Sequence, residues 1–214
     1  MTGEVLFTAV AIICAYLIGS FPSAYIAGRV RKGIDIREVG SRNMGAMNVF
    51  YKVGFVEGIL VLAVDIGKGA AAVALAYWLL RVPLYEPQLF VLLAGAAAVI
   101  GHSFPVFLKF RGGRGGATCI GILIFLMPWS IPVYLAIFGL TLLLTRYPTL
   151  SYSIALLCFP FIAWLIYHSG VLVAFSVGIL LLPGVKYIPR IKEMRATGGS
   201  WRHVFLRRSL KDRL

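Results

Sequence analysis

The chain has 214 residues, 60% of them hydrophobic, and a mean hydropathy of +0.89. Soluble domains are roughly 45–50% apolar, so this composition excludes a single water-soluble domain and indicates a protein solvated by lipid. The charge is basic, with 21 Lys and Arg against 8 Asp and Glu. This bias is the cytoplasmic excess of membrane proteins and also suits an anionic substrate, whereas no soluble domain remains to bind nucleic acid.

Apolar stretches long enough to cross a bilayer recur along the chain and predict helices. The first three cover about 5–27, 53–80 and 89–108. The first has no basic region or cleavage site ahead of it, so we expect a retained helix and not a signal peptide. A longer apolar region, 117–186, is interrupted at MPWSIP, RYPTL and YHSG.

Basic residues gather in the loop at 28–52, the loop after residue 108 and the C-terminal tail, so all three should be cytoplasmic and the N-terminus outside. An even number of membrane crossings must then separate the loop after residue 108 from the C-terminal tail. Dividing 117–145 at MPWSIP gives about seven crossings in all, although its halves of roughly 12–15 residues are short for a bilayer. The alternative is one kinked helix and a final re-entrant or interfacial segment.

The fold predicted from these patterns is an all-α integral membrane bundle of about seven transmembrane helices, some of them short. Its N-terminus lies outside and its C-terminus in the cytoplasm. We expect a membrane domain over 1–187 and a basic cytoplasmic tail over 188–214.

The strongest local motif is GHSFPVFLKFRGGRGGAT, residues 101–118. Its glycines can turn successive N–H groups toward an anion, its cations add charge, and a helix beginning near Ala117 adds its dipole. We expect a phosphate site, because a flexible basic loop touching anionic lipid head groups explains the glycines less well. No Walker motif is present. The candidate binding residues are His102, Lys109, Arg111, Gly112, Gly113, Arg114, Gly115, Gly116 and Thr118.

A second motif, GSRNMGAMNVF at 40–50, contributes Ser41, Asn43 and Asn48 as candidate catalytic residues. These side chains can hold hydroxyls and phosphate oxygens without adding charge, although an ordinary helix-capping loop has the same composition. Asp65 and Lys68 lie at i,i+3 spacing in an apolar segment, where they should pair. They either anchor helices or approach the phosphate site as further binding residues.

The remaining polar residues suggest structural roles. Ser20, Pro22 and Ser23 should end the first helix and allow close helix packing. His168 and His203 are expected in solvent. The three cysteines lie in apolar stretches without metal-ligand spacing and should be buried hydrophobes, so we expect no metal and no cofactor: Cys14, Cys119 and Cys158.

Together these motifs resemble the bacterial acyl-phosphate-dependent glycerol-3-phosphate acyltransferases. The resemblance covers about residues 10–187 and rests on GSFPSAYIAGR, DIREVGSRNMGAMN, DIGKG, GHSFPVFLKFRGGRGGAT and TRYPTLSYSIA, in that order. It implies a multi-pass enzyme of the bacterial cytoplasmic membrane. Such an enzyme transfers an acyl group from acyl phosphate to the 1-hydroxyl of glycerol 3-phosphate, giving lysophosphatidic acid for phospholipid synthesis.

The resemblance also assigns residues. It places Ser41 and Asn43 in an active-site loop with Asn48 nearby, and Lys109 with glycines 112, 113 and 115 in a glycerol-phosphate-binding loop. The resemblance is to a divergent member of the family: Arg42 stands where the family pattern has a glycine, Met47 where it has a threonine and Tyr51 where it has an arginine, and the family's tail motif is not recognisable. A catalytically impaired paralogue that binds acyl phosphate or lipid, and a transporter of a phosphorylated solute, therefore remain alternatives.

The His-x4-Asp device of other glycerolipid acyltransferases is absent, since His102, His168 and His203 are followed at that spacing by Phe107, Val173 and Arg208. Acyl phosphate is already activated, so positioning and charge stabilisation should suffice. We therefore expect direct, substrate-assisted transfer without an acyl-enzyme.

Overall fold

The computed structural model describes residues 2–198, which form helices and loops without a strand. The chain divides into two compact units, 1–126 and 127–214, and each is described by itself. The all-helical architecture predicted from the apolar pattern is confirmed for the described residues.

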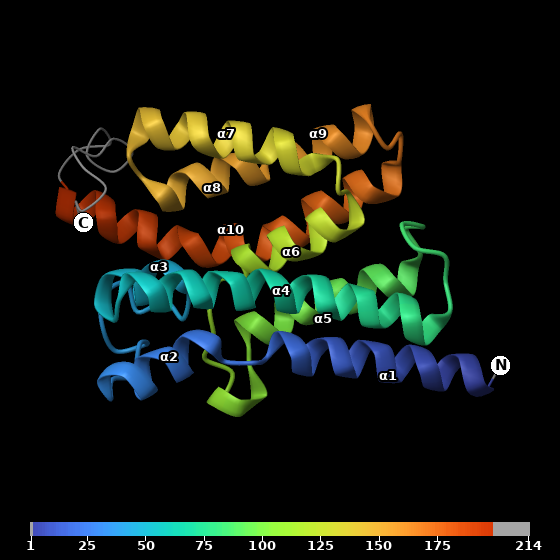
Figure 1. Ribbon diagram of the computed structural model, residues 1–214, viewed down its shortest axis with the longest axis horizontal. Helices are drawn as coiled ribbons and strands as arrows, with labels where there is room; N and C mark the ends of the chain where they lie inside the picture. Colours follow the sequence, from blue (N-terminus) through green and yellow to red (C-terminus); the bar gives the residue numbers. More distant parts are fainter. Residues whose placement is uncertain (1, 199–214) are drawn as a thin grey trace. The chain divides into compact units, whose positions relative to one another are not determined.

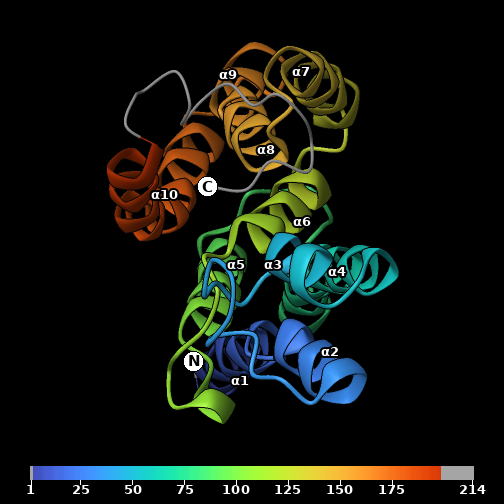
Figure 2. The ribbon, with the colours of Figure 1, turned by 90° about the vertical axis from the view of Figure 1, so that its left-hand side faces the viewer.

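The first unit contains every candidate site residue. Its helices are α1 (Thr2–Gly19), α2 (Ser23–Lys32), α3 (Ala46–Lys52), α4 (Phe55–Leu80), α5 (Leu89–Ser103) and α6 (Gly116–Leu126), with a 3₁₀ turn, η1 (Val106–Leu108). Helices α1, α4 and α5 lie side by side, α6 packs on α4, and the short α3 packs against α4 (Figures 1 and 2).

Glycines let the backbones of these helices approach closely. A methyl group on Gly19 of α1 would overlap the carbonyl of Ala98 in α5, and one on Gly121 of α6 would overlap the carbonyl of Ile66 in α4. Gly101 of α5 meets α1 in the same way. Without a hydrophobic driving force between helices in lipid, such close van der Waals packing is a principal source of association.

The first predicted segment is interrupted where expected but continues further. Helix α1 ends at Gly19, because Pro22 has no N–H to donate and its ring opposes a continuous helix. The chain then resumes as α2 and stays helical to Lys32, where Gly33 adopts a left-handed φ of 67°. The expectation that the polar loop begins at residue 28 was therefore wrong, since Gly28 lies buried inside α2.

Five helical stretches are long and apolar enough to cross a membrane: Glu4–Lys32, Phe55–Leu80, Leu89–Leu108, Pro148–Leu165 and Gly170–Ala196. Two shorter apolar helices, Gly116–Leu126 and Ser130–Thr145, accompany them. The chain is thus a multi-pass membrane protein, and the two short helices are the predicted halves of the region around MPWSIP. Seven crossings and their orientation remain predictions.

The second unit contains α7 (Ser130–Thr145), α8 (Pro148–Leu156), α9 (Cys158–Leu165) and α10 (Gly170–Gly198). Helix α8 packs on α7, and α10 packs on α9. Because α6 ends at Leu126 and α7 begins at Ser130, the apolar run does divide at MPWSIP. Helix α10 runs through residue 187 despite Pro183 and Pro189, so the boundary of the tail stays a prediction. His203 and the rest of 199–214 lie outside the described residues.

Candidate active site

The segment between α2 and α4 is an ordered loop built on its own apolar cluster. Ile36 and Val49 are completely buried and Met44 is 2% exposed, and all three pack with Ala24 of α2 and Val61 of α4. A polar-looking loop therefore has a fixed shape, because three of its residues are inserted into the unit like core side chains.

Asn48 holds this loop together through its side-chain amide. Its Nδ2 donates to the carbonyls of Ile36, Val39 and Asn43 at 2.9, 3.0 and 3.1 Å, and its Oδ1 accepts from the backbone N–H of Ser41 at 3.1 Å. The side chain is 4% exposed, so these bonds replace its contact with water. Asn48 shapes the loop on which the other two candidate catalytic residues lie.

Ser41 and Asn43 are partly buried, on either side of the exposed Arg42. Among the described residues, neither the Ser41 hydroxyl nor the Asn43 amide has a hydrogen-bond partner, so both can bind a ligand. Arg42 has a φ of +53°, a left-handed conformation that costs a non-glycine residue about 1–2 kcal/mol. Glycine, which the family resemblance leads us to expect at this position, would adopt this φ without that strain.

The basic loop begins as a tight turn after Pro105. The N–H of Phe110 donates to the Pro105 carbonyl at 3.0 Å, and the N–H of Arg111 donates to the Leu108 carbonyl at 3.2 Å. Within this turn Lys109 and Phe110 have φ values of +53° and +60°. Lys109 and Arg111 are exposed, and in the part of the chain that is described their side chains form no ion pair.

The glycines of the basic loop bring it against the Asn48-held loop. A methyl group on Gly113 would overlap both His102 Nε2 and the carbonyl oxygen of Met44, so the two loops meet at that residue. The N–H of Gly113 donates to the His102 carbonyl at 3.1 Å. This N–H was predicted to face an anion, but it is used for a hydrogen bond within the protein. Gly115, at φ +91°, leads into α6 one residue earlier than the predicted start.

A buried polar network lies beneath this junction. Lys68 Nζ is 2.8 Å from Asp65 Oδ1 and donates to the Phe21 carbonyl at 3.1 Å, in the break between α1 and α2. The Ser23 hydroxyl donates to the same Asp65 oxygen at 2.7 Å. Asp65 is 1% exposed, and it is a buried carboxylate paired with an ammonium and a hydroxyl, as burial of charge requires. The predicted pairing of Asp65 with Lys68 is confirmed.

His102 connects the network to the basic loop. Its Nδ1 lies 3.3 Å from Thr118 Oγ1 and 3.7 Å from Asp65 Oδ1, while its Nε2 faces Gly113. The Asp65–Lys68 pair thus joins α4 to the break between α1 and α2 and lies beside His102, whereas phosphate binding by these two residues stays a prediction. Ser23 was expected only to allow close packing, and nothing in its local sequence indicated a bond to Asp65.

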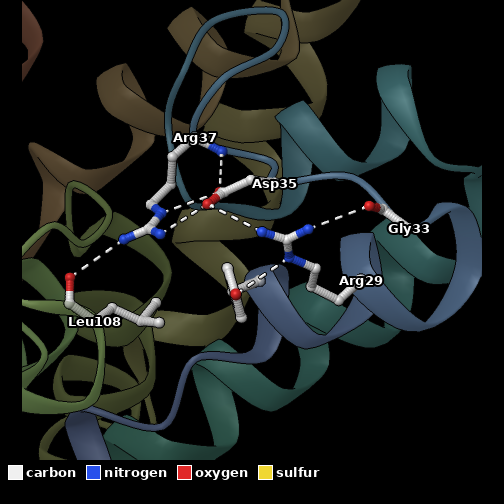
Figure 3. A network of polar contacts seen from close by, with 6 residues as sticks. Arg29, Gly33, Asp35, Arg37 and Leu108 are labelled. Carbon is white, nitrogen blue, oxygen red and sulfur yellow. Dashed lines mark hydrogen bonds and ion pairs between the residues drawn. The ribbon is translucent and has the colours of Figure 1, made fainter.

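Two further residues of the loop, Asp35 and Arg37, were not identified from the sequence as site residues. Arg37 pairs with Asp35 through Nη2 at 2.7 Å and Nε at 3.0 Å, and its Nη1 donates to the Leu108 carbonyl at 3.2 Å (Figure 3). The hydrogen-bonded guanidinium lowers the pKa of Asp35 to about 2. The bond from Arg37 to the Leu108 carbonyl is a second connection between the two loops.

Metal ligation has no candidate here, because the described residues contain no group of three or more His, Cys, Asp or Glu side chains. Cys119 and Cys158 are buried and Cys14 is partly buried, and all three are free thiols. The prediction that the cysteines are small buried hydrophobes is confirmed for Cys119 and Cys158.

Comparison with known proteins identifies the family of this chain. Residues 9–197 match the family model of glycerol-3-phosphate acyltransferase. The chain is 53% identical to "Glycerol-3-phosphate acyltransferase 2" of Dehalococcoides mccartyi, over 96% of each chain. It is 51% identical to the glycerol-3-phosphate acyltransferase of Bacillus velezensis, over 67% of this chain and 71% of that one.

Two solved structures have the same fold. The crystal structure of PlsY, an integral membrane glycerol 3-phosphate acyltransferase, in its glycerol 3-phosphate form has a TM-score of 0.80 and 26% identity, and covers 97% of this chain and 95% of its own. Its lysophosphatidic acid form has a TM-score of 0.76 and 26% identity, covering 90% and 92%. With a family model matched over nearly the whole chain and a relative at 53% identity, this chain belongs to the glycerol-3-phosphate acyltransferase family.

Proposed function

We propose that this protein transfers an acyl group from acyl phosphate to the 1-hydroxyl of glycerol 3-phosphate, giving lysophosphatidic acid for phospholipid synthesis. The observation that carries the proposal is the meeting of two loops at Gly113 and the Met44 carbonyl. One loop carries uncharged hydroxyl and amide groups, and the other carries cations. An acceptor with one phosphate and one reactive hydroxyl requires both kinds of group in one place.

The basic loop would bind the phosphate groups. Lys109 and Arg111 are exposed and available, and Arg114 lies in the same loop at the start of α6. Glycerol 3-phosphate and acyl phosphate are both anions, so holding them together requires cations that offset their repulsion. Gly112, Gly113, Gly115 and Gly116 let the backbone of this loop pass close to its neighbours, which keeps the cations at a fixed place.

The other loop would orient the attacking hydroxyl. The Ser41 hydroxyl and the Asn43 amide are free to hydrogen bond with it, and Asn48 would act through them by fixing the backbone around both. His102, Thr118, Asp65 and Lys68 are buried at or below 6% exposure, so we assign them to the support of the phosphate-binding loop from beneath.

Direct transfer needs no covalent enzyme intermediate. The acceptor hydroxyl oxygen forms a bond to the acyl carbonyl carbon, and the bond from that carbon to the phosphate oxygen breaks, with its electron pair leaving on phosphate. A phosphate oxygen accepts the hydroxyl proton. Acyl phosphate is a good donor for this reaction because phosphate is a stable leaving group, so orientation and charge stabilisation are the main contributions left to the protein.

The test is turnover by purified protein in detergent, with a long-chain acyl phosphate and radiolabelled glycerol 3-phosphate. Formation of labelled lysophosphatidic acid with one phosphate released per product would support the proposal. Binding of both substrates without product would favour an impaired paralogue, and uptake of label into vesicles without acylation would favour a transporter. A covalent acyl-protein adduct trapped during turnover would refute the direct mechanism.

A further inference from the structure

All the nitrogens of the Arg37 side chain are engaged in bonds within the protein. Nε and Nη2 form a side-on pair with the Asp35 carboxylate, and Nη1 donates to the Leu108 carbonyl. One face of the guanidinium packs on the Tyr25 ring, 5.1 Å from its centroid, and the side chain is 17% exposed. Three of its five N–H groups are bonded in this way, so the side chain joins the Asp35 carboxylate to the Leu108 carbonyl.

The carbonyl that Arg37 holds lies at a strained point of the basic loop. Leu108 ends η1, and the next two residues, Lys109 and Phe110, both adopt left-handed φ values although neither is glycine. Such conformations persist only where surrounding contacts over-determine them. The Leu108 carbonyl also accepts the N–H of Arg111, so the Arg37 bond acts on the residue around which this turn closes.

We propose that Arg37, oriented by Asp35, is a positioning residue that holds the Lys109 turn in its phosphate-binding conformation. The two segments are 71 residues apart in the chain, and this bond sets the position of the cationic turn relative to the loop bearing Ser41 (Figure 3). The lowered pKa of Asp35 agrees with this role, because the carboxylate stays charged and keeps Arg37 oriented across the physiological range. The kinetic part of this inference rests on the proposed function.

Arg29 provides a matched control. It also lies beside Asp35, at 3.8 Å, and beside the Tyr25 ring, at 5.3 Å, but its other hydrogen bonds go to Tyr25 and to the Gly33 carbonyl. It thus shares the charge and the surroundings of Arg37 without a bond to the basic loop.

The kinetic experiment compares Arg37→Gln, Arg37→Lys, Asp35→Asn and Arg29→Gln in purified protein. We expect Arg37→Gln to raise the KM for glycerol 3-phosphate about tenfold, the loss of one charge-assisted hydrogen bond, with kcat changed less than about twofold. Arg37→Lys should not restore the KM, because one ammonium cannot bond Asp35 and Leu108 with Arg's fork geometry. Asp35→Asn should act in the same direction, and Arg29→Gln should stay within about twofold of wild type.

A double variant tests whether Arg37 acts through Lys109. If it does, the double variant Arg37→Gln, Lys109→Gln should have the same KM for glycerol 3-phosphate as Lys109→Gln alone. Two results would overturn the proposal: a KM increase in the double variant equal to the product of the two single increases, or restoration of the KM by Arg37→Lys. Either result means that Arg37 contributes its charge independently of the turn.

Hydrogen exchange gives a readout that does not depend on catalysis. Loss of the Arg37 bond should speed exchange of the Phe110 and Arg111 amides, whose hydrogen bonds close the turn, while Arg29→Gln leaves them unchanged. Unchanged exchange in Arg37→Gln would overturn the positioning role even in an active enzyme. Faster exchange in a protein that makes no lysophosphatidic acid would support the positioning role and count against the proposed function alone.

Discussion

Replacing Lys68 by Met would leave a carboxylate stranded in the interior of the first unit. Asp65 is 1% exposed and would lose the ammonium at 2.8 Å, keeping only the Ser23 hydroxyl and the more distant His102 ring. The Phe21 carbonyl would lose its donor at the same time. Removing one partner of a buried ion pair costs about 3–5 kcal/mol. For a chain of this size that corresponds to a fall in Tm of roughly 6–20 °C.

The measurement is thermal unfolding of purified protein in detergent at neutral pH, followed by a thiol-reactive dye that reports exposure of the buried cysteines. The double variant Asp65→Asn, Lys68→Met removes both charges while keeping an acceptor for Ser23, and it should recover more than half of the loss. Glu193→Gln breaks an ion pair of the same i,i+3 spacing, 2.7 Å long, in which the Glu193 side chain is 61% exposed. It should cost less than about 0.5 kcal/mol.

A Lys68→Met shift no larger than that of Glu193→Gln would refute the reasoning. It would mean that the interior accommodates the Asp65 carboxylate without the ammonium, so the network would not be a closed structural unit. Equal losses in the single and double variants would assign the cost to packing of the lysine stem and not to the stranded charge.

Four further outcomes follow from the same structure. Arg42→Gly should raise stability by about 0.5–1 kcal/mol in thermal unfolding, because relief of the left-handed strain exceeds the added entropy of the unfolded chain; a lower Tm would contradict this. Ser41→Ala should lower kcat with little change in KM, as steady-state kinetics would show, if its hydroxyl orients the acceptor in the transition state. Gly113→Ala should raise the KM for glycerol 3-phosphate and cost about 1–3 kcal/mol in stability, since its methyl group displaces the two loops; a normal Tm would place that methyl group in open space. Because the folded pKa of Asp35, about 2, lies below its ordinary 3.8, the stability it contributes is present above pH 3.8 and is lost as pH falls through 2; Tm should therefore fall more steeply over that range in wild type than in Asp35→Asn.

The helices could be predicted from the sequence because lipid permits few alternatives. A backbone in hydrocarbon must satisfy its own hydrogen bonds, so each long apolar run becomes a helix. Pro22 and Pro128 lie at two of the breaks, although α10 continues through Pro183 and Pro189. The extension of α2 to Lys32 was missed because basic residues suggested a loop, whereas a helix reaching the interface can present Arg29, Arg31 and Lys32 at its own end.

The composition of the candidate site was predictable, but its internal bonds were not. Glycines among cations indicate an anion loop whatever surrounds them, and GSRNMGAMN indicates a polar loop. Whether an asparagine side chain binds a ligand or the backbone of its own loop depends on the folded shape of that loop. The Asn48 side chain binds the backbone of its own loop. Arg37 was counted only as a cytoplasmic charge, since its partner Leu108 is supplied by a segment far away in the chain.

The glycine contacts between helices explain how far this family can drift in sequence. Where backbone meets backbone, as at Gly19 and Ala98, the helix spacing is set in part by atoms common to every residue and depends less on the neighbouring side chains. Apolar side chains on the outside, such as Phe55 and Leu60, are more than half exposed, so one apolar residue can replace another there at little cost. A protein built this way can keep a TM-score of 0.80 at 26% identity.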